Sequence, residues 1–324
     1  MSNKICTLTV VLISVVLLSA QSAEAQTYPT RPLEVICPYT PGSSSDIATR
    51  LIADIGPKYF GQPIVVVNKP GAGGSIAAAE VISSKPDGYK VFGGYQVFFA
   101  TTIRTQKVPF NPFDLVPLAN FVELKLGMEV KADSPFKTFD DVLSYGRKNP
   151  GQLKWCHPGR GITLHMSALI IFKKAGIQTI DIPYKGPSEA LAALLGGHVD
   201  VGSIGYGPVS DQVRAGKVRF LMFYTDKRYS DQPNVPTALE LGYPDAVLPT
   251  FFGLYVHKDT AENIRKTLTD VCKKIYDDPE FKKGIEKLGE QPKFGGPEFI
   301  KEAIKKQEEI GIPILKEIGL YVGQ

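Results

Sequence analysis

The chain has 324 residues, a formal net charge of +4 and 43% hydrophobic residues. This length is enough for two ordinary α/β domains, each with its own core. The mild positive charge is not typical of a nucleic-acid-binding protein, so no nucleic-acid partner is expected. Beyond residue 25, no stretch is apolar for long enough to cross a membrane.

The N-terminus has the pattern of a secretory signal peptide. Lys4 precedes an apolar run over residues 5–20, and Ala23-Glu24-Ala25 supplies a small-x-small cleavage triplet. A retained membrane anchor is the alternative, but an anchor needs roughly 20 apolar residues and this run is shorter. We therefore expect residues 1–25 to be removed and the mature chain to reach the periplasm.

Short apolar runs alternate with helical patterns along the rest of the chain. This alternation predicts the α/β class, with mainly parallel sheets and crossover helices. The expected strands span residues 33–38, 63–67, 89–93, 153–157, 178–183, 199–204 and 218–224. Apolar residues at helical spacing predict helices over 47–55, 76–82, 163–175, 188–195 and 261–276. A last helical pattern starts at Pro297 and is expected to break or kink at Gly311 and Pro313.

Two proline-rich spans interrupt the alternation, at residues 108–117 and 229–249. Strands near 121–130 and 251–256 flank these spans. We interpret them as the segments that carry the chain from one lobe to the other and back. Two such crossings predict a hinged molecule of two lobes with a cleft between them.

A Gly/Ser turn over Gly42 to Ser45 opens directly into the first helix. Free backbone N–H groups and hydroxyls at such a helix N-terminus hold carboxylate or phosphate groups. The alternative interpretation is ordinary capping, with Ser43 or Ser44 as the N-cap and Asp46 in the first turn.

Other clusters of reactive residues carry weaker signals. Residues 70–74 are rich in glycine but do not follow the G-x-G-x-x-G pattern, which argues against a nucleotide site. Cys156, His157 and His165 lack the spacing of a zinc site, so no metal is expected. The mature chain has an odd number of cysteines, Cys37, Cys156 and Cys272, which we expect to be buried thiols.

Several motifs in this order and spacing resemble the Bug-type receptors of tripartite tricarboxylate transporters. They are Tyr28-Pro29 through Pro41-Gly42 and Asp46; Gly61-Gln62-Pro63; Val66 to Gly74; Lys85-Pro86-Asp87-Gly88-Tyr89; Pro150-Gly151; Gly159, Gly161 and His165; Pro183-Tyr184-Lys185-Gly186; Leu194 to Gly197 with Val199-Asp200-Val201; Ala215-Gly216-Lys217; and Asn234-Val235-Pro236-Thr237. The resemblance covers essentially the whole mature chain.

The resemblance implies a two-lobed fold of the periplasmic-binding-protein type II, with two crossing strands between the lobes. The first lobe would comprise residues 26–124 and the return segment 251–324, and the second lobe residues 125–250. It also implies a non-enzymatic receptor without cofactor or catalytic residue. Such a receptor delivers a small organic carboxylate to integral membrane transporter subunits. Because both lobes must move, a monomer is expected.

The resemblance further implies that backbone groups and bridging water grip the ligand at strand-to-helix loops of both lobes. In the first lobe these loops are residues 39–46, 69–74 and 94–98, and in the second they are 157–165, 184–188 and 203–207. The expected ligand-binding residues are Tyr39, Pro41, Gly42, Ser43, Ser44, Ser45, Asp46, Gly73, Tyr95, Gln96, His157, Gly159, Arg160, Gly161, Thr163, His165, Lys185, Gly186, Gly205 and Tyr206.

Two cationic side chains and an unusual loop bear on the ligand. The planar guanidinium of Arg160 would suit a bidentate hydrogen bond to a second carboxylate at the far end of the ligand. The alternative is that Arg160 points to solvent. Lys185 either attracts anions or is a solvated charge. The loop 203–208 has Tyr206 and two glycines where the family tends to carry an acidic or amide residue and a small apolar one. This loop leaves room for a bulkier ligand. Further departures from the family pattern, at Ser43, Ala168-Leu169 and Phe251-Phe252-Gly253, favour a hydrophobic carboxylate, aromatic or a longer dicarboxylate, over citrate.

Two other functions remain open. A small-acid hydrolase or isomerase would use His165 or Asp46 as a base, but neither a G-x-S-x-G elbow nor a pair of carboxylates at catalytic spacing is present. The same binding fold would also serve as a ligand sensor for a sensor kinase ectodomain, which the sequence does not distinguish from transport.

Overall fold

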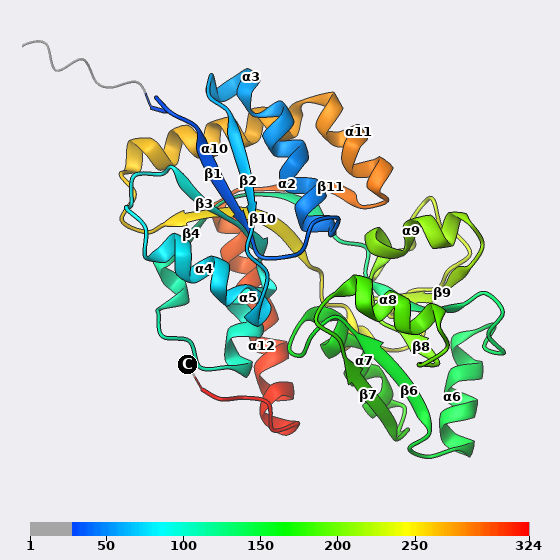
Figure 1. Ribbon diagram of the computed structural model, residues 1–324. Coiled ribbons are helices and arrows are strands. Elements are labelled where there is room, and N and C mark those ends of the chain that lie inside the picture. Colours follow the sequence, from blue (N-terminus) through cyan, green and yellow to red (C-terminus); the bar gives the residue numbers. More distant parts are fainter. Residues whose placement is uncertain (1–27, 324) are drawn as a thin grey trace, which may run out of the picture.

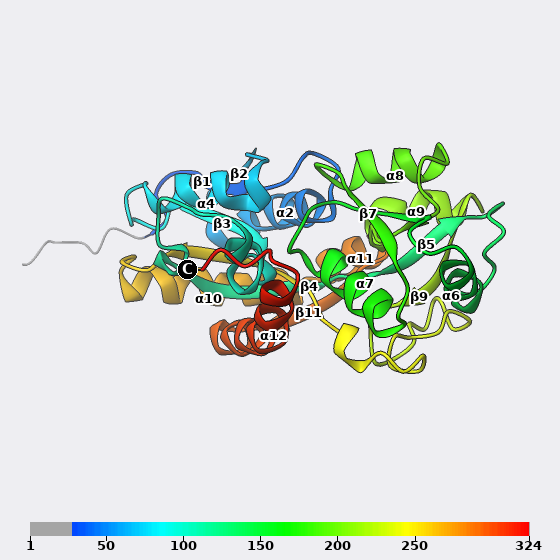
Figure 2. The ribbon, with the colours of Figure 1, turned by 90° about the horizontal axis from the view of Figure 1, so that it is seen from below.

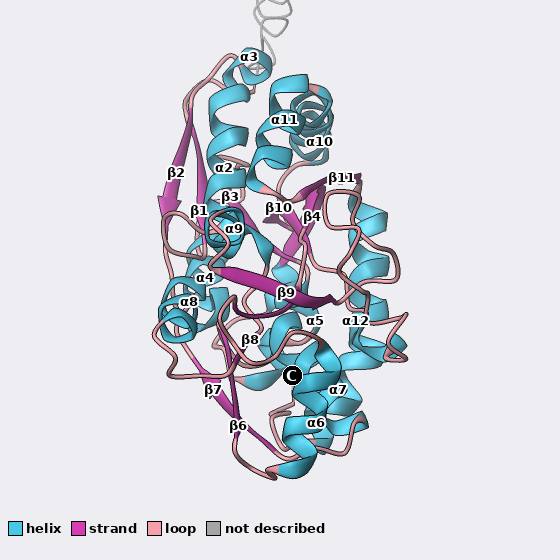
Figure 3. Ribbon diagram, turned by 90° about the vertical axis from the view of Figure 1, so that its right-hand side faces the viewer, coloured by secondary structure: helices cyan, strands magenta, loops and turns pink. Residues whose placement is uncertain are grey.

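The computed structural model describes residues 28–323, so the expected signal peptide lies outside the described residues. The described chain forms two separate sheets, and Figure 1 shows them as two lobes side by side. Figure 3 shows helices beside the strands of both sheets. No helix within residues 28–323 is long and apolar enough to span a bilayer.

The first sheet has six strands in the order β11-β4-β10-β3-β1-β2. Their bounds are β1 Leu33–Cys37, β2 Ile64–Asn68, β3 Lys90–Tyr95, β4 Leu115–Glu123, β10 Phe251–His257 and β11 Gln291–Gly295. Leu33 and Val35 of β1 enter the core on one face, and Ile36 enters the core on the other. Because successive side chains of a strand alternate between faces, an apolar strand such as β1 requires cover on both sides.

Helices provide that cover. On one face lie α2 (Ser44–Ile55), α10 (Glu262–Asp277) and α11 (Pro279–Leu288), with the short α3 (Pro57–Phe60) after α2. On the other face lie α4 (Ser75–Ile82), α5 (Val97–Ala100) and the start of α12 (Pro297–Glu317). Short 3-10 turns occupy residues 72–74, 102–105, 112–114 and 244–246.

The second sheet has five strands in the order β7-β6-β8-β5-β9. Their bounds are β5 Gly127–Lys131, β6 Leu153–His157, β7 Thr179–Pro183, β8 Val201–Gly202 and β9 Val218–Phe223. One face packs against α6 (Phe139–Lys148) and α7 (Thr163–Lys174), and the other against α8 (Pro187–Leu195) and α9 (Tyr206–Arg214).

The expectation of mainly parallel sheets is wrong. β1 is parallel to β2 and β3, and β6 is parallel to β7 and β8, but the other strand pairs are antiparallel. Every antiparallel pair includes β4, β5 or β10, the strands next to the crossings between lobes. β5 and β10 enter their sheets directly from the other lobe, and β4 leaves its sheet toward the other lobe, so none of these connections includes the crossover helix that a parallel neighbour needs.

Two crossing segments join the lobes, as expected. The chain leaves β4 at Glu123 and enters β5 at Gly127, and it returns to the first sheet at Phe251. The N–H of Leu124 donates to the carbonyl of Thr250 at 2.9 Å, so the two crossings are hydrogen-bonded to each other. The exact lobe boundaries, 26–124, 125–250 and 251–324, remain our proposal.

The last helix connects the lobes a third time. Ile300 near the start of α12 packs in a core of the first lobe, whereas Leu315 near its end is fully buried in a core of the second. Figure 2 shows α12 beside the junction of the lobes. The helix continues through Gly311 and Pro313 to Glu317, so the expected break does not occur.

The three described cysteines are free and buried, as expected. Cys37 ends β1, Cys156 lies in β6 and Cys272 faces the core from α10. Burial raises the pKa of each thiol, which keeps it in the neutral, unreactive form.

If α12 holds the second lobe, shortening Leu315 must destabilise the whole molecule. We expect Leu315→Ala to cost about 2–5 kcal/mol in the free energy of unfolding, because it leaves a cavity in a closed core. Chemical denaturation followed by tryptophan fluorescence measures this loss. Leu239→Ala is the matched control because Leu239 is 46% exposed, and equal losses in both variants would contradict the packing role of Leu315.

Candidate functional site

A pocket lies between the two lobes, beside the crossing segments, with a volume of about 80 Å³. Both lobes and both crossings contribute to its wall. The wall is formed by Tyr39, Ser43, Ser44, Tyr95, Val97, Leu124, Leu126, Pro158, Ile162, Thr163, Leu164, Pro187, Ile204, Gly205, Pro208, Thr250 and Glu290. Most of these side chains are apolar, so the pocket suits a ligand with an apolar body.

Four helices point their N-termini at this pocket. Its wall includes Ser44 at the start of α2, Thr163 at the start of α7, Pro187 at the start of α8 and Gly205, the N-cap of α9. Each helix N-terminus carries unpaired N–H groups and a partial positive charge. The four together make the pocket attractive to an anion, although no lysine or arginine lines it.

The first loop shows the capping arrangement. Ser43 is the N-cap of α2, and its hydroxyl accepts a hydrogen bond from the N–H of Asp46 at 3.3 Å. Gly42 has a φ of +84°, a conformation that favours glycine. The N–H groups of Ser44 and Ser45 have no hydrogen-bond partner among the described residues. Capping and anion binding are therefore compatible at this turn, because they use different donors.

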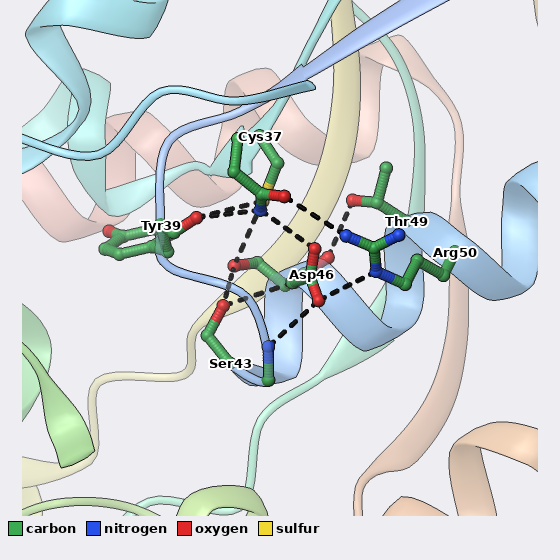
Figure 4. A network of polar contacts seen from close by, with 9 residues as sticks. Cys37, Tyr39, Ser43, Asp46, Thr49 and Arg50 are labelled. Atoms are coloured by element: carbon green, nitrogen blue, oxygen red, sulfur yellow. Dashed lines mark hydrogen bonds and ion pairs between the residues drawn. The ribbon is translucent and has the colours of Figure 1, made fainter. Parts of the chain in front are cut away.

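Asp46 holds this loop in place (Figure 4). Its carboxylate accepts hydrogen bonds from the Gly42 N–H at 2.9 Å, from Arg50 Nε at 3.0 Å and from Asn68 Nδ2 at 2.8 Å. Burial alone would raise the pKa of Asp46, but these hydrogen bonds outweigh it and lower the pKa. With both oxygens engaged and no place in the pocket wall, Asp46 is poorly suited to act as a base.

A second polar cluster fixes the loop after β6. Asp181 Oδ2 lies 2.7 Å from Arg160 Nη1, 3.5 Å from His157 Nε2 and 3.7 Å from His165 Nε2. Hydrogen bonds from the two histidines, together with the charge of Arg160, hold the pKa of Asp181 well below its usual range. Asp181 therefore ties down the loop over residues 157–165 from the neighbouring strand β7.

The same cluster has the composition of a metal site, but the protonation of His165 does not suit one. Ligand atoms of His157, His165 and Asp181 lie within 4.8 Å of one another. However, the Nδ1 of His165 accepts a hydrogen bond from the Gly161 N–H at 3.2 Å, which places the ring proton on Nε2, the nitrogen that faces Asp181. Burial also lowers the pKa of His165, which keeps the ring neutral. We interpret the cluster as a hydrogen-bonded latch.

Thr163 links the pocket to the hinge. Ile162 is the N-cap of α7, and Thr163 is its first residue. The Thr163 hydroxyl lies 2.6 Å from that of Thr250 and accepts a hydrogen bond from Gln307 Nε2 at 3.1 Å. Gln96 in turn donates to Gln307 Oε1 at 2.9 Å. This chain of side chains joins the pocket wall to α12 and to the return crossing.

A wider cavity of about 640 Å³ adjoins the pocket and shares Tyr39, Pro158, Ile162 and Pro187 with it. The glycine-rich turn 70–74 and residues 184–187 form opposite parts of its wall. Arg160 and Lys185 line this cavity. The guanidinium of Arg160 is already paired with Asp181, and contact of either cation with a ligand remains a prediction.

Eleven of the twenty expected ligand-binding residues line one of these two spaces: Tyr39, Ser43, Ser44, Gly73, Tyr95, Gly159, Arg160, Thr163, Lys185, Gly186 and Gly205. The other nine lie outside both walls, namely Pro41, Gly42, Ser45, Asp46, Gln96, His157, Gly161, His165 and Tyr206. The six expected loops all contribute to the walls. Tyr206 begins α9 and stacks on Phe220 in a core, so it does not widen the pocket.

Five residues of the pocket wall lie outside the six loops expected from the sequence. Leu124, Leu126 and Thr250 belong to the crossing segments, and Pro208 lies in the first turn of α9. The fifth, Glu290, follows α11 near the C-terminus and reaches the pocket from a part of the chain that carried no site signal. Its position depends on a long-range packing that no local pattern reveals.

Two mixed α/β lobes, two crossings and a pocket between the lobes define the class of periplasmic binding proteins. The profile of the TctC family, "Tripartite tricarboxylate transporter family receptor", matches residues 48–320. The chain therefore belongs to the tripartite tricarboxylate transporter receptor family.

Individual relatives agree with this assignment. A Cupriavidus necator protein named "UPF0065 protein in gbd 5'region" is 36% identical over 95% of this chain and 94% of its own length. Protein BugT of Bordetella pertussis is 30% identical over 76% of each chain. The solved structure "R. palustris Rpa4515 with adipate" superposes with a TM-score of 0.84 at 25% identity, over 90% of this chain and 98% of the other.

The latch at Asp181 predicts a specific effect on stability. We expect Asp181→Asn to cost about 1–3 kcal/mol at pH 7, because the histidines and Arg160 lose a charged acceptor. A folded-state pKa below the usual value means that the stabilisation is complete above an unfolded pKa of 3.8. The difference between wild type and variant should therefore shrink as the pH falls below that value. Urea denaturation at several pH values measures it, and a constant difference down to pH 2.5 would contradict the latch.

Proposed function

We propose that this protein is a periplasmic solute receptor that binds a small organic carboxylate between its lobes and delivers it to the membrane subunits of a tripartite transporter. The observation that carries the proposal is the convergence of four helix N-termini on one pocket. A carboxylate is the anion that matches both this field and the family, and the structural neighbour Rpa4515 of R. palustris was solved with adipate.

The proposed ligand contacts both lobes. Ser44 and Tyr95 come from the first lobe, and Thr163 and Gly205 from the second. A ligand that touches both walls binds the closed arrangement more tightly than an open one, and so shifts the population toward closure. Closure is the signal that a membrane partner would recognise.

The two candidate catalytic bases are poorly placed to act on a bound ligand, which supports a receptor and not an enzyme. Asp46 and His165 are buried, hydrogen-bonded and outside the pocket wall. We therefore propose a receptor without catalytic residues, exported with loss of residues 1–25. Uptake of a labelled carboxylate should stop when the gene is deleted and resume when it is restored, and uptake that continues unchanged in the deletion strain would contradict the transport role.

A thermal-shift screen tests carboxylate binding. The panel contains mono-, di- and tricarboxylates, aliphatic and aromatic, each paired with its neutral amide. At a hundredfold excess over its dissociation constant a ligand stabilises the folded state by about 2.7 kcal/mol. We expect carboxylates to raise the melting midpoint and their amides not to do so. Equal stabilisation by the amides would contradict the proposed role of the helix N-termini.

A negative charge introduced at the N-terminus of α7 tests whether this helix terminus attracts the ligand carboxylate. Ile162 is an N-cap without a side-chain hydrogen bond and lines the pocket. Asp and Asn are equally good N-caps, so both substitutions preserve the helix. We expect Ile162→Asp to weaken carboxylate binding about tenfold or more in titration calorimetry, while Ile162→Asn weakens it much less. Equal losses would show that the charge at this helix N-terminus does not matter.

A further inference from the structure

The pocket contains one ionisable carboxyl group of its own. Glu290 is only 3% exposed and forms part of the pocket wall. A buried carboxylate disfavours a second negative charge nearby. Its presence beside four helix N-termini therefore restricts which anions the pocket accepts.

Three donors hold the Glu290 carboxylate. Oε1 accepts hydrogen bonds from the Ser44 hydroxyl at 3.0 Å and from the Gly207 N–H at 3.2 Å. Oε2 accepts one from the Lys125 N–H at 2.7 Å. Gly207 lies in the first turn of α9, so Glu290 takes donors at the starts of both α2 and α9. The N–H groups at the starts of α7 and α8, and those of Ser44 and Ser45, remain available for the carboxylate of a ligand.

The charge of Glu290 has no cation paired with it within residues 28–323. The nearby Lys125 ammonium lies 2.7 Å from Asp231 Oδ1 and sits over the rings of Tyr206 and Tyr229. Since Oε1 already has two donors and Oε2 has one, the carboxylate retains capacity to accept a further hydrogen bond at Oε2. A hydrogen-bond donor on the ligand would satisfy it, whereas a second ligand carboxylate would be repelled.

Resting on the carboxylate-binding function proposed above, we propose that Glu290 is a specificity-determining residue. It selects a ligand that carries a hydroxyl or ammonium group in addition to its carboxylate, and it disfavours plain dicarboxylates. The ligand carboxylate lies toward the starts of α7 and α8, its apolar body contacts Leu126 and Ile204, and its donor group faces Glu290.

The charge of Glu290 also makes this selection depend on pH. Burial raises its pKa to about 7, and the three hydrogen bonds and the charge of Lys125 offset this only in part. Below that value the group is neutral and tolerates a second carboxylate, and above it the group is charged and repels one. The titratable groups that face it or interact with it are Lys125, Asp231, Tyr95, Tyr206 and Tyr229.

A series of six-carbon acids tests the proposal. Hexanoate, 6-hydroxyhexanoate, 6-aminohexanoate and adipate share one body and differ only in the second end group. At pH 8 we expect wild type to bind the better of the hydroxy and amino acids at least about tenfold more tightly than adipate. The tighter of the two identifies the donor. Glu290→Gln should bring this ratio to within about threefold, because a carboxamide can donate to a carboxylate.

Glu123→Gln is the matched control, since Glu123 lies in β4 outside the pocket wall and should leave the ratio unchanged. If Glu290→Gln does not fold, wild type alone gives the answer. Its affinity for adipate relative to hexanoate should fall about fivefold or more between pH 6 and pH 8. A ratio that is the same in wild type and Glu290→Gln, or an adipate affinity independent of pH, would overturn the role of Glu290. Binding of no carboxylate at all would overturn the proposed function, and this inference with it.

Discussion

The pairing of the two crossing segments is the constraint on which the rest of the structure depends. Leu124 and Thr250 are 126 residues apart in sequence, yet their backbones are hydrogen-bonded at 2.9 Å. The two crossings therefore lie side by side at the junction of the lobes. The pocket forms beside that junction, and its wall therefore draws on loops from both lobes and on the crossings themselves. The network from Thr163 through Gln307 to Gln96 anchors the same junction to α12.

The electrostatics of the pocket follow from the topology of the sheets. In each lobe, parallel strands deliver the chain to the start of a helix at their carboxyl ends, and ligands of α/β proteins bind at that edge. β1 leads into α2, β6 into α7 and β7 into α8. When the two sheets face each other across the junction, these helix starts converge. The positive field thus needs no basic residue, which leaves Glu290, the one acidic residue among the described residues of the pocket wall, to shape selectivity.

Local patterns in the sequence predicted those parts of the fold that depend on local chemistry. The parallel strands, the Gly/Ser turn before α2 and the loops that line the pocket follow from apolar runs that end in glycine or serine. The antiparallel pairing of β4, β5 and β10 and the position of β11 at the sheet edge depend on partners far away in sequence, and no local signal reveals them. Asp181 also carried no signal in the sequence, because it lies in an ordinary strand pattern. The pairing of β7 with β6 brings its carboxylate to His157, Arg160 and His165.

The late position of β10 and α12 in the chain has a consequence for how the molecule is made. β10 lies between β3 and β4 in the first sheet, so that sheet has a gap until residue 257 is available. The core of the second lobe is completed even later in synthesis, because it includes Leu315 of α12. A chain synthesised from its N-terminus can therefore finish neither lobe before nearly all of it has emerged. Such a chain cannot complete its fold during synthesis, and an incompletely folded polypeptide is the form that can be threaded through a membrane pore.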